Sequence, residues 1–449
     1  MKKYIIIVFI FLMIISIHAE KWNVQRCIDY ALEENIQLKN KRRSKEIVNE
    51  EIMEAYGSFL PSAKVEGSKV LKESTMKTSF PVLTDIQQTP QGDLIPVMEQ
   101  KEFEQDVITN YQYQLKVSQP LFMGGSLYYN LKNKYIEKNI SNYEIKKQKM
   151  DLVYNVYSIY YNLVYTKMML NITKESIDIT KKQVDMIKER YENGEASNLD
   201  LLQARVELNN LYPRRIKLRS AYNNGLKNLK NTIGLDQRVE FQIVDEFPEI
   251  EFGYEENYKK LMKIARKNSP SLNILESKLE QLNNSETMMK GSYLPNILLT
   301  GSYGQQKEDW DDNWQDNYNL MLTFSWNIFD GFTRESNLSK IYINENILDD
   351  NYNYTRDQIS TAIRTQFENI KEASKRVEAE KENLKLAKEN LNMANQSYEE
   401  GLISVLDLMK ARLSYNNSKS SLVQAKYDKN LAILELKKSL GILGKKEEK

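Results

Sequence analysis

The sequence predicts a mainly α-helical protein that also carries β-hairpins suited to the wall of a membrane β-barrel. Three observations support this prediction. The chain contains an internal repeat, so that one helix–β-hairpin–helix unit occurs twice. Each half has segments in which apolar side chains alternate with a period of two. Each half then continues through a long run that lacks both proline and glycine.

The internal repeat is clearest around residues 200 and 407. The segment from Arg190 to Arg205 recurs as Ser397 to Arg412, at an offset of 207 residues (407 minus 200). Earlier in each half, the segment Phe59-Leu60-Pro61 matches Tyr293-Leu294-Pro295 at an offset of 234 residues (295 minus 61). Two halves related in this way indicate a duplication.

The two offsets differ by 27 residues (234 minus 207), so the first half carries an insertion between about residues 68 and 114. Pro81, Pro90, Gly92 and Pro96 lie in this insertion among polar residues. Proline and glycine at such a density interrupt regular structure. We therefore expect a long loop here.

Each half contains two segments with the period of a β-strand. These are Ala63–Gly67 and 108–122 in the first half, and 297–303 and 317–328 in the second. Apolar and aromatic residues alternate with polar ones, most clearly in the last segment. The residues that we expect on the lipid face of a barrel are Tyr111, Tyr113, Leu115, Leu320, Leu322, Phe324 and Trp326.

Strands with one aromatic-rich apolar face suit two structures. They could form a soluble sheet packed on helices, or a barrel wall between lipid and water. The strands reach about ten residues, which is the length that a tilted membrane strand needs. The predicted helices are too long and too polar to cover such a sheet, so we favour the barrel wall.

Each half has one very long predicted helix. The runs from Gly125 to Gly194 and from Gly331 to Gly401 contain no proline or glycine between these ends. At about 1.5 Å per residue each helix would be about 100 Å long, which indicates a coiled-coil assembly. Shorter helices, about 22–57 and 198–233 in the first half, together have about the length of the long one. A long helix packed beside a stacked pair is the expected geometry.

Four strands cannot close a barrel, because the smallest closed membrane barrels need about eight. Open sheet edges are not tolerated in lipid, so the chain must oligomerise if its strands lie in a membrane. A dimer would supply eight strands and a trimer twelve. An eight-stranded barrel is filled by its own side chains, whereas twelve strands leave room for a pore. The strand count alone leaves this choice open.

The N-terminus has the features of a secretory signal. Lys2 and Lys3 precede an apolar run from Tyr4 to Ile17, and Ala19 follows at the expected cleavage site. The run is too short for a transmembrane helix, and no later segment is apolar and long enough to cross a bilayer as a helix. If the protein lies in a membrane, strands must hold it there.

Composition excludes several classes of function. Without the signal the chain has no histidine, since His18 is the only one, and Cys27 is its only cysteine. An intrachain disulfide and His-assisted nucleophilic catalysis are therefore excluded, and we expect Cys27 to be a small core residue of the first helix. A net charge of +1 argues against nucleic acid as a partner. We expect no enzymatic activity and no metal or cofactor.

At this point the sequence resembles the TolC family of outer-membrane efflux proteins over nearly the whole mature chain. The resemblance depends on the duplication, the Leu-Pro junctions at Pro61 and Pro295, and the strand-to-helix turns around Gly124 and Gly331. It depends also on the paired motifs at residues 194–204 and 401–411. The resemblance implies a homotrimer whose twelve-stranded barrel continues into a twelve-helix periplasmic tunnel.

The resemblance also assigns roles to the paired motifs, which lie where helices turn at the periplasmic end. Asp407 matches an acidic residue that rings the entrance, and Asp200 and Tyr398 match residues that link neighbouring helices there. The expected gate residues are thus Asp407, Asp200, Tyr398 and Lys410, and the expected adaptor-docking tips are Gly194, Leu199, Gly401 and Leu406.

Two positions depart from the family pattern. Lys410 stands where well-known members have a second Asp, and Ile403 stands where they have an Arg partner. The bonds of the gate therefore differ, and a double acidic ring is not expected. Three Asp407 carboxylates at a constriction would favour cations. Alternatively, Asp407 and Asp200 only cap the helices that begin nearby.

The predicted organisation is a signal peptide (1–19), a first repeat (20–240), a connecting segment (241–253), a second repeat (254–443) and a disordered tail (444–449). The resemblance implies a passive outer-membrane channel of a tripartite efflux or secretion system, with a long periplasmic extension. Its implied partners are outer-membrane lipid, a periplasmic adaptor protein and an inner-membrane pump (RND, ABC or MFS type). The alternative is a structural or adhesive coiled-coil protein of the periplasm or cell surface.

Overall fold

The computed structural model describes residues 21–69, 76–88, 92, 94–105, 111–247, 250, 257–307 and 313–444. The predicted signal peptide lies outside the described residues, as do part of the connecting segment and residues 445–449 of the predicted tail. Most described residues are helical. They divide into a helical unit, within residues 21–48, 137–279 and 346–444, and a strand unit, within residues 49–136 and 280–345.

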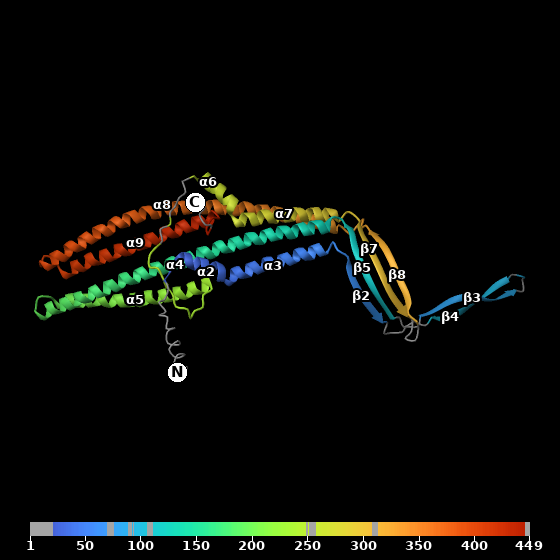
Figure 1. Ribbon diagram of the computed structural model, residues 1–449, viewed down its shortest axis with the longest axis horizontal. Coiled ribbons are helices and arrows are strands. Elements are labelled where there is room, and N and C mark those ends of the chain that lie inside the picture. Colours follow the sequence, from blue (N-terminus) through green and yellow to red (C-terminus); the bar gives the residue numbers. More distant parts are fainter. Residues whose placement is uncertain are drawn as a thin grey trace, which may run out of the picture. The chain divides into compact units, whose positions relative to one another are not determined.

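The described helices are α2 (Val24–Glu34), α3 (Ile36–Gly57), α4 (Ser126–Glu192), α5 (Asn198–Ile233), α6 (Tyr258–Asn268), α7 (Pro270–Gly291), α8 (Thr333–Glu399) and α9 (Val405–Ser439). The described strands are β1 (Lys21–Trp22), β2 (Ser62–Lys69), β3 (Met76–Gln88), β4 (Leu94–Gln105), β5 (Tyr111–Met123), β6 (Gln242–Ile243), β7 (Asn296–Lys307) and β8 (Gln315–Ser325). Figure 1 shows their order along the chain.

The two long helices are confirmed. Both α4 and α8 contain 67 residues. In the helical unit, buried residues of α4 recur at intervals of three and four, as in Val153, Val156, Tyr160 and Leu163. This spacing places them on one face of the helix, where they pack against other helices. In Figure 1, α5 runs back beside α4, and α9 runs back beside α8. Among the described residues, no helix is both long and apolar enough to cross a membrane.

The first predicted short helix is in fact two helices. Asn35 ends α2 with a ψ of 124°, and its buried side chain accepts a hydrogen bond from the Leu38 N–H at 3.0 Å. Its amide also donates to the Thr232 carbonyl at 2.8 Å. Because the Asn35 side chain caps the start of α3 and also contacts the end of α5, the helix breaks here, although the apolar period of the sequence continues.

Helix α5 ends against this interruption, which confirms the predicted stacked pair. A Cβ on Gly234, which has a φ of 82°, would lie 2.9 Å from the Glu34 carbonyl oxygen. In the second half, a Cβ on Gly441 would lie 2.6 Å from the carbonyl carbon of Asn268. The two contacts are related by the same offsets as the sequence motifs, 207 (441 minus 234) and 234 (268 minus 34).

The tyrosine-rich part of α4 lies in the main core of the helical unit. The Tyr160 hydroxyl donates to the Trp22 carbonyl at 3.1 Å and accepts from the Val244 N–H at 3.2 Å, which joins it to the β1–β6 strand pair. The Tyr154 hydroxyl donates to Glu435 at 2.8 Å. Both hydroxyls are therefore bonded to protein groups. Burial raises the pKa of Tyr160.

Cys27 lies in the same core and is fully buried, which confirms its prediction as a core residue. Burial raises the pKa of its thiol to about 12. A thiol that stays protonated is a poor nucleophile and a poor metal ligand.

The strand unit contains a four-stranded antiparallel sheet in the order β2-β5-β7-β8. Its register separates the side chains by polarity. One face carries apolar residues from all four strands, including Val65, Leu115, Tyr303 and Leu322, while the other face is mainly polar. Within the described residues, β2 and β8 each have one unpaired edge.

The insertion in the first half forms a hairpin, so the prediction of a long loop is wrong. Strands β3 and β4 pair with each other, and Leu83 lies opposite Met98. Pro81 and Pro96 led to the wrong prediction. Each of these two strands has only one paired neighbour in the described chain, and an edge strand tolerates proline because one row of its N–H groups has no partner.

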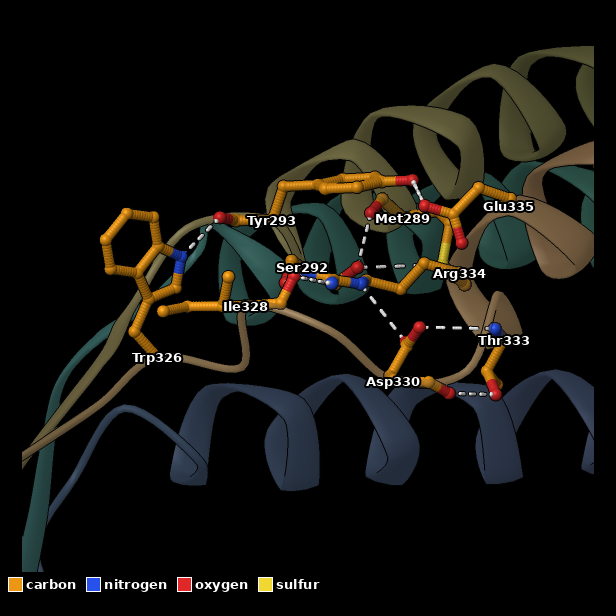
Figure 2. A network of polar contacts seen from close by, with 9 residues as sticks. All are labelled: Met289, Ser292, Tyr293, Trp326, Ile328, Asp330, Thr333, Arg334 and Glu335. Atoms are coloured by element: carbon orange, nitrogen blue, oxygen red, sulfur yellow. Dashed lines mark hydrogen bonds and ion pairs between the residues drawn. The ribbon is translucent and has the colours of Figure 1, made fainter.

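A buried arginine holds the start of α8 (Figure 2). The Arg334 side chain is only 9% exposed, and its Nε lies 3.1 Å from the Asp330 carboxylate. Its Nη2 donates to the Ile328 carbonyl at 3.0 Å, and the guanidinium stacks 4.4 Å from the centre of the Tyr293 ring. The Trp326 indole donates to the Tyr293 carbonyl at 3.0 Å. These contacts fix the chain where strand becomes helix.

The turn between β5 and α4 packs directly against the end of α7. A Cβ on Gly291 would lie 1.9 Å from the Gly124 carbonyl oxygen, and a Cβ on Gly124 would lie 2.2 Å from the Gly291 carbonyl oxygen. Gly124 also has a φ of 58°. Only glycine fits at both positions, because the two backbones touch.

We predict that Gly291→Ala lowers the melting temperature of the detergent-solubilised protein. The added methyl group would force the two backbones apart, at a cost of about 1–3 kcal/mol. Thermal unfolding followed by circular dichroism measures the change. Thr287→Ala, on an exposed position of the same helix, is the control and should change stability by less than about 0.5 kcal/mol. Equal melting temperatures for the two variants would contradict the close contact.

Candidate functional site: the helical tips and the two-faced sheet

Each helical tip reverses the chain through a glycine in the left-handed region. Gly194 has a φ of 77° and Gly401 a φ of 75°. In both turns the residue after glycine donates to a carbonyl five residues earlier, from Glu195 to Arg190 at 2.7 Å and from Leu402 to Ser397 at 2.8 Å. This pattern closes the C-terminus of a helix and needs glycine's freedom at that position.

The helices that leave the tips start with matching serine N-caps, and the one at α5 is a full capping box. Ser197 and Ser404 are the N-caps, and their hydroxyls accept from the N–H groups of Asp200 at 3.1 Å and Asp407 at 3.2 Å. Each hydroxyl also donates to the carboxylate of its Asp at 2.7 Å. The prediction that Asp200 and Asp407 cap these helices is therefore corrected. The serines are the caps, and the aspartates are their partners three residues later.

Asp407 has a second neighbour that Asp200 lacks. The Lys410 ammonium donates to the Asp407 carboxylate at 3.4 Å. The hydrogen bond from Ser404 and the contact with Lys410 lower the pKa of Asp407. The side chain remains 53% exposed. Asp407 is therefore an accessible carboxylate that stays ionised at neutral pH, with part of its charge offset by its own lysine.

Tyr398 contacts Arg190, a residue that the sequence did not single out. The Arg190 guanidinium, from the last turn of α4, stacks 5.3 Å from the centre of the Tyr398 ring of α8. Arg190 also lies 3.5 Å from Glu195, and these two neighbours raise its pKa. The sequence carried no signal for this contact, because the repeat only aligns Arg190 with Ser397 and does not show which residues touch.

A small apolar cluster holds the tips together. Val184 and Ile187 of α4 pack with Leu201 and Ala204 of α5, and Met409 of α9 packs against them. The residues predicted as docking tips lie outside this cluster. Leu199 is 63% exposed and Leu406 is 40% exposed, and both glycines are exposed.

The sheet brings together most of the residues predicted for a lipid face. Tyr318, Leu320, Leu322 and Phe324 of β8 lie on one face and are 62–81% exposed. Tyr113 and Leu115 of β5 belong to the same face, as does Tyr111, whose ring lies between Lys69 and Lys307. The prediction that Trp326 belongs to this strand face needs correction. Strand β8 ends at Ser325, so this indole lies at the junction with α8.

The described residues offer no group of three or more His, Cys, Asp or Glu side chains placed to hold a metal ion. The features that remain are a two-faced sheet with unpaired edges, very long helices and capped, exposed tips.

Comparison with known proteins identifies this combination. The family model of the outer membrane efflux protein matches residues 27–235 and 261–442, which is most of the chain. The chain belongs to the outer membrane efflux protein family. Membership confirms the predicted family and the predicted location in the outer membrane.

Individual relatives agree with this membership. The outer membrane protein TolC of Escherichia coli K12 is 21% identical over 319 residues, which span 66% of this chain and 62% of that protein. The outer-membrane channel CmeC of Campylobacter jejuni superposes with a TM-score of 0.77 at 20% identity, over 95% of this chain and 87% of CmeC. The outer-membrane channel MtrE of Neisseria gonorrhoeae gives a TM-score of 0.73 at 16% identity, over 93% and 89% of the two chains.

Proposed function

We propose that the protein is the outer-membrane channel of a tripartite efflux or secretion system. Three copies would form a passive duct, a twelve-stranded barrel continuous with a twelve-helix periplasmic tunnel. The duct would carry drugs, small molecules or proteins without catalysing a reaction or binding a cofactor. An inner-membrane pump (RND, ABC or MFS type) would supply the energy, and a periplasmic adaptor would join pump and channel.

The two-faced sheet carries this proposal. An apolar, aromatic face that no described element covers suits contact with lipid, and the polar face suits a water-filled interior. Tyr318 is 81% exposed and Leu320 is 77% exposed. The alternative, an adhesive coiled-coil protein, requires the hairpins to pack on helices, and such packing would bury these side chains.

The repeat supplies the register in which copies would join. In the first hairpin Val65 lies opposite Leu115, and adding 234 and 207 residues gives Leu299 opposite Leu322, which is the pairing in the second hairpin. The repeat therefore relates strand registers as well as sequence motifs.

The same residue offsets can be applied to the pairing of β5 with β7, which joins the two hairpins. Lys116 of β5 pairs with Ser302 of β7. The corresponding residues are Thr323 of β8 (116 plus 207) and Ser68 of β2 (302 minus 234). Both belong to strands with an unpaired edge. We therefore expect Thr323 of one copy to lie opposite Ser68 of the next, which pairs both edges.

We predict that a Ser68→Cys, Thr323→Cys variant forms a covalent trimer on mild oxidation. Directly opposed residues of antiparallel strands lie about 4.5–5.5 Å apart at Cα, within the range of a disulfide. Cys27 would first be replaced by Ala, because it is the chain's only cysteine. Denaturing gel electrophoresis without reductant measures the product.

The control is Gly67→Cys with Thr323→Cys. A shift of one residue places the two thiols on opposite faces of the sheet, so this pair should not cross-link. A covalent dimer that never extends to a trimer would favour an eight-stranded closure. Monomer alone from the matched pair would contradict the proposed edge.

The tips would serve the two roles implied by the family resemblance. Asp407, with Asp200, Tyr398 and Lys410, would form the periplasmic gate, and Leu199 and Leu406, with Gly194 and Gly401, would dock the adaptor. The exposure of Asp407 and of both leucines supports these roles. Three ionised Asp407 side chains around one axis would attract cations.

We predict that two sets of substitutions separate these roles. Asp407→Asn should weaken the block of single channels by a trivalent cation in planar bilayers by about tenfold, because it removes one charge per copy. Leu199→Gln with Leu406→Gln, which adds no charge, should leave this block unchanged but abolish dye efflux from cells. An unchanged block in Asp407→Asn would remove Asp407 from the gate, and normal efflux in the leucine variant would remove the docking role.

A further inference from the structure

A half-buried positive charge without a carboxylate partner among the described residues lies in the helical unit, near the start of α9. The Nε and Nη1 atoms of Arg412 are buried and have no hydrogen-bond partner, and Nη2 has only a long contact of 3.4 Å with Asn395. Among the residues that the structure describes, no carboxylate forms an ion pair with it. Burial lowers the pKa of Arg412, and no neighbouring charge offsets this effect.

A second unsatisfied donor belongs to a side chain that lines the same pocket as Arg412. Gln183 of α4 is only 7% exposed, and its Nε2 is buried without a hydrogen-bond partner. Gln183 and Arg412 both line a pocket of about 170 Å³ between α4, α5 and α9. Buried amide and guanidinium groups are normally paired, and here three unpaired N–H donors belong to two side chains that line one hollow, which favours a ligand in it.

The charge of the pocket indicates what fills it. Arg214, Lys410 and Arg412 line it, against one acidic residue, Glu207. Water would satisfy hydrogen bonds in a polar hollow of this size but would leave the guanidinium charge unbalanced. An anion with several acceptor oxygens would satisfy both the N–H groups and the charge.

We propose that this pocket binds a small oxyanion of the size of inorganic phosphate, held by Arg412 of α9 and Gln183 of α4. The bound anion joins the two helices at a point where their direct polar contacts are few, such as Asn416 with Ser176 at 3.0 Å. All the groups belong to one chain, so the site does not depend on the proposed function.

The repeat offers a matched control for Arg412. Arg205 occupies the corresponding place in α5, 207 residues earlier, and is exposed. Replacing either arginine by Met removes the same charge and keeps a similar bulk. Only the change at residue 412 removes the buried cation.

The experiment is a titration of the full-length, detergent-solubilised protein with inorganic phosphate, at constant pH and with ionic strength held by sodium chloride. A ligand that binds only the folded state raises its melting temperature. Millimolar phosphate should raise that of the wild type and of Arg205→Met by about 2–4 °C. Arg412→Met should show no rise, and isothermal calorimetry should detect phosphate binding only to the first two.

Gln183→Glu provides an independent test if Arg412→Met fails to fold. The new carboxylate would take the place of the anion, so this variant should melt higher than the wild type without phosphate and should not respond to phosphate. An equal response of all variants would mean a general salt effect and would overturn the proposal. The absence of any response in the wild type would also overturn it, in favour of water or another part of the assembly as the occupant.

Discussion

The requirement that backbone N–H and C=O groups be paired wherever water is absent governs this molecule. Its four-stranded sheet has one apolar face and two edges without a partner among the described residues. An unpaired edge in lipid would cost several kcal/mol for each unsatisfied group. One chain cannot meet this requirement with four strands. The proposed assembly of three copies meets it, because each free edge finds the complementary edge of the next copy.

Because of the repeat, the same type of contact can occur within one chain and between copies. The hairpin registers follow the offsets of 234 and 207 residues, and so do the backbone contacts of Gly234 with Glu34 and of Gly441 with Asn268. A contact used between the two halves of one chain can therefore be used again between copies. The two halves differ in some side-chain contacts near the tips. Arg190 stacks on Tyr398, and Arg412 is half-buried whereas Arg205 is exposed.

Sequence periodicity predicted the elements that follow a single local rule. The 67-residue helices and the two-faced strands were visible because proline, glycine and alternating apolar residues directly encode them. The break at Asn35 was not, because it depends on a contact with Thr232, which is distant in sequence. The β3–β4 hairpin was missed because proline is tolerated on edge strands. At the tips, the Ser404–Asp407 cap is local and its Ser-x-x-Asp spacing could have predicted it, whereas the partner of Tyr398 required three-dimensional proximity.

The proposed sheet separates lipid from water, and adjacent residues of β8 allow this separation to be measured. Spin labels would be attached singly at residues 322 and 323 of the reconstituted protein, and their accessibility to oxygen and to a water-soluble nickel complex would be measured. The account predicts that the label at Leu322 is reached mainly by oxygen dissolved in lipid, and the label at Thr323 mainly by the nickel complex. Equal exposure of both labels to the nickel complex would contradict it.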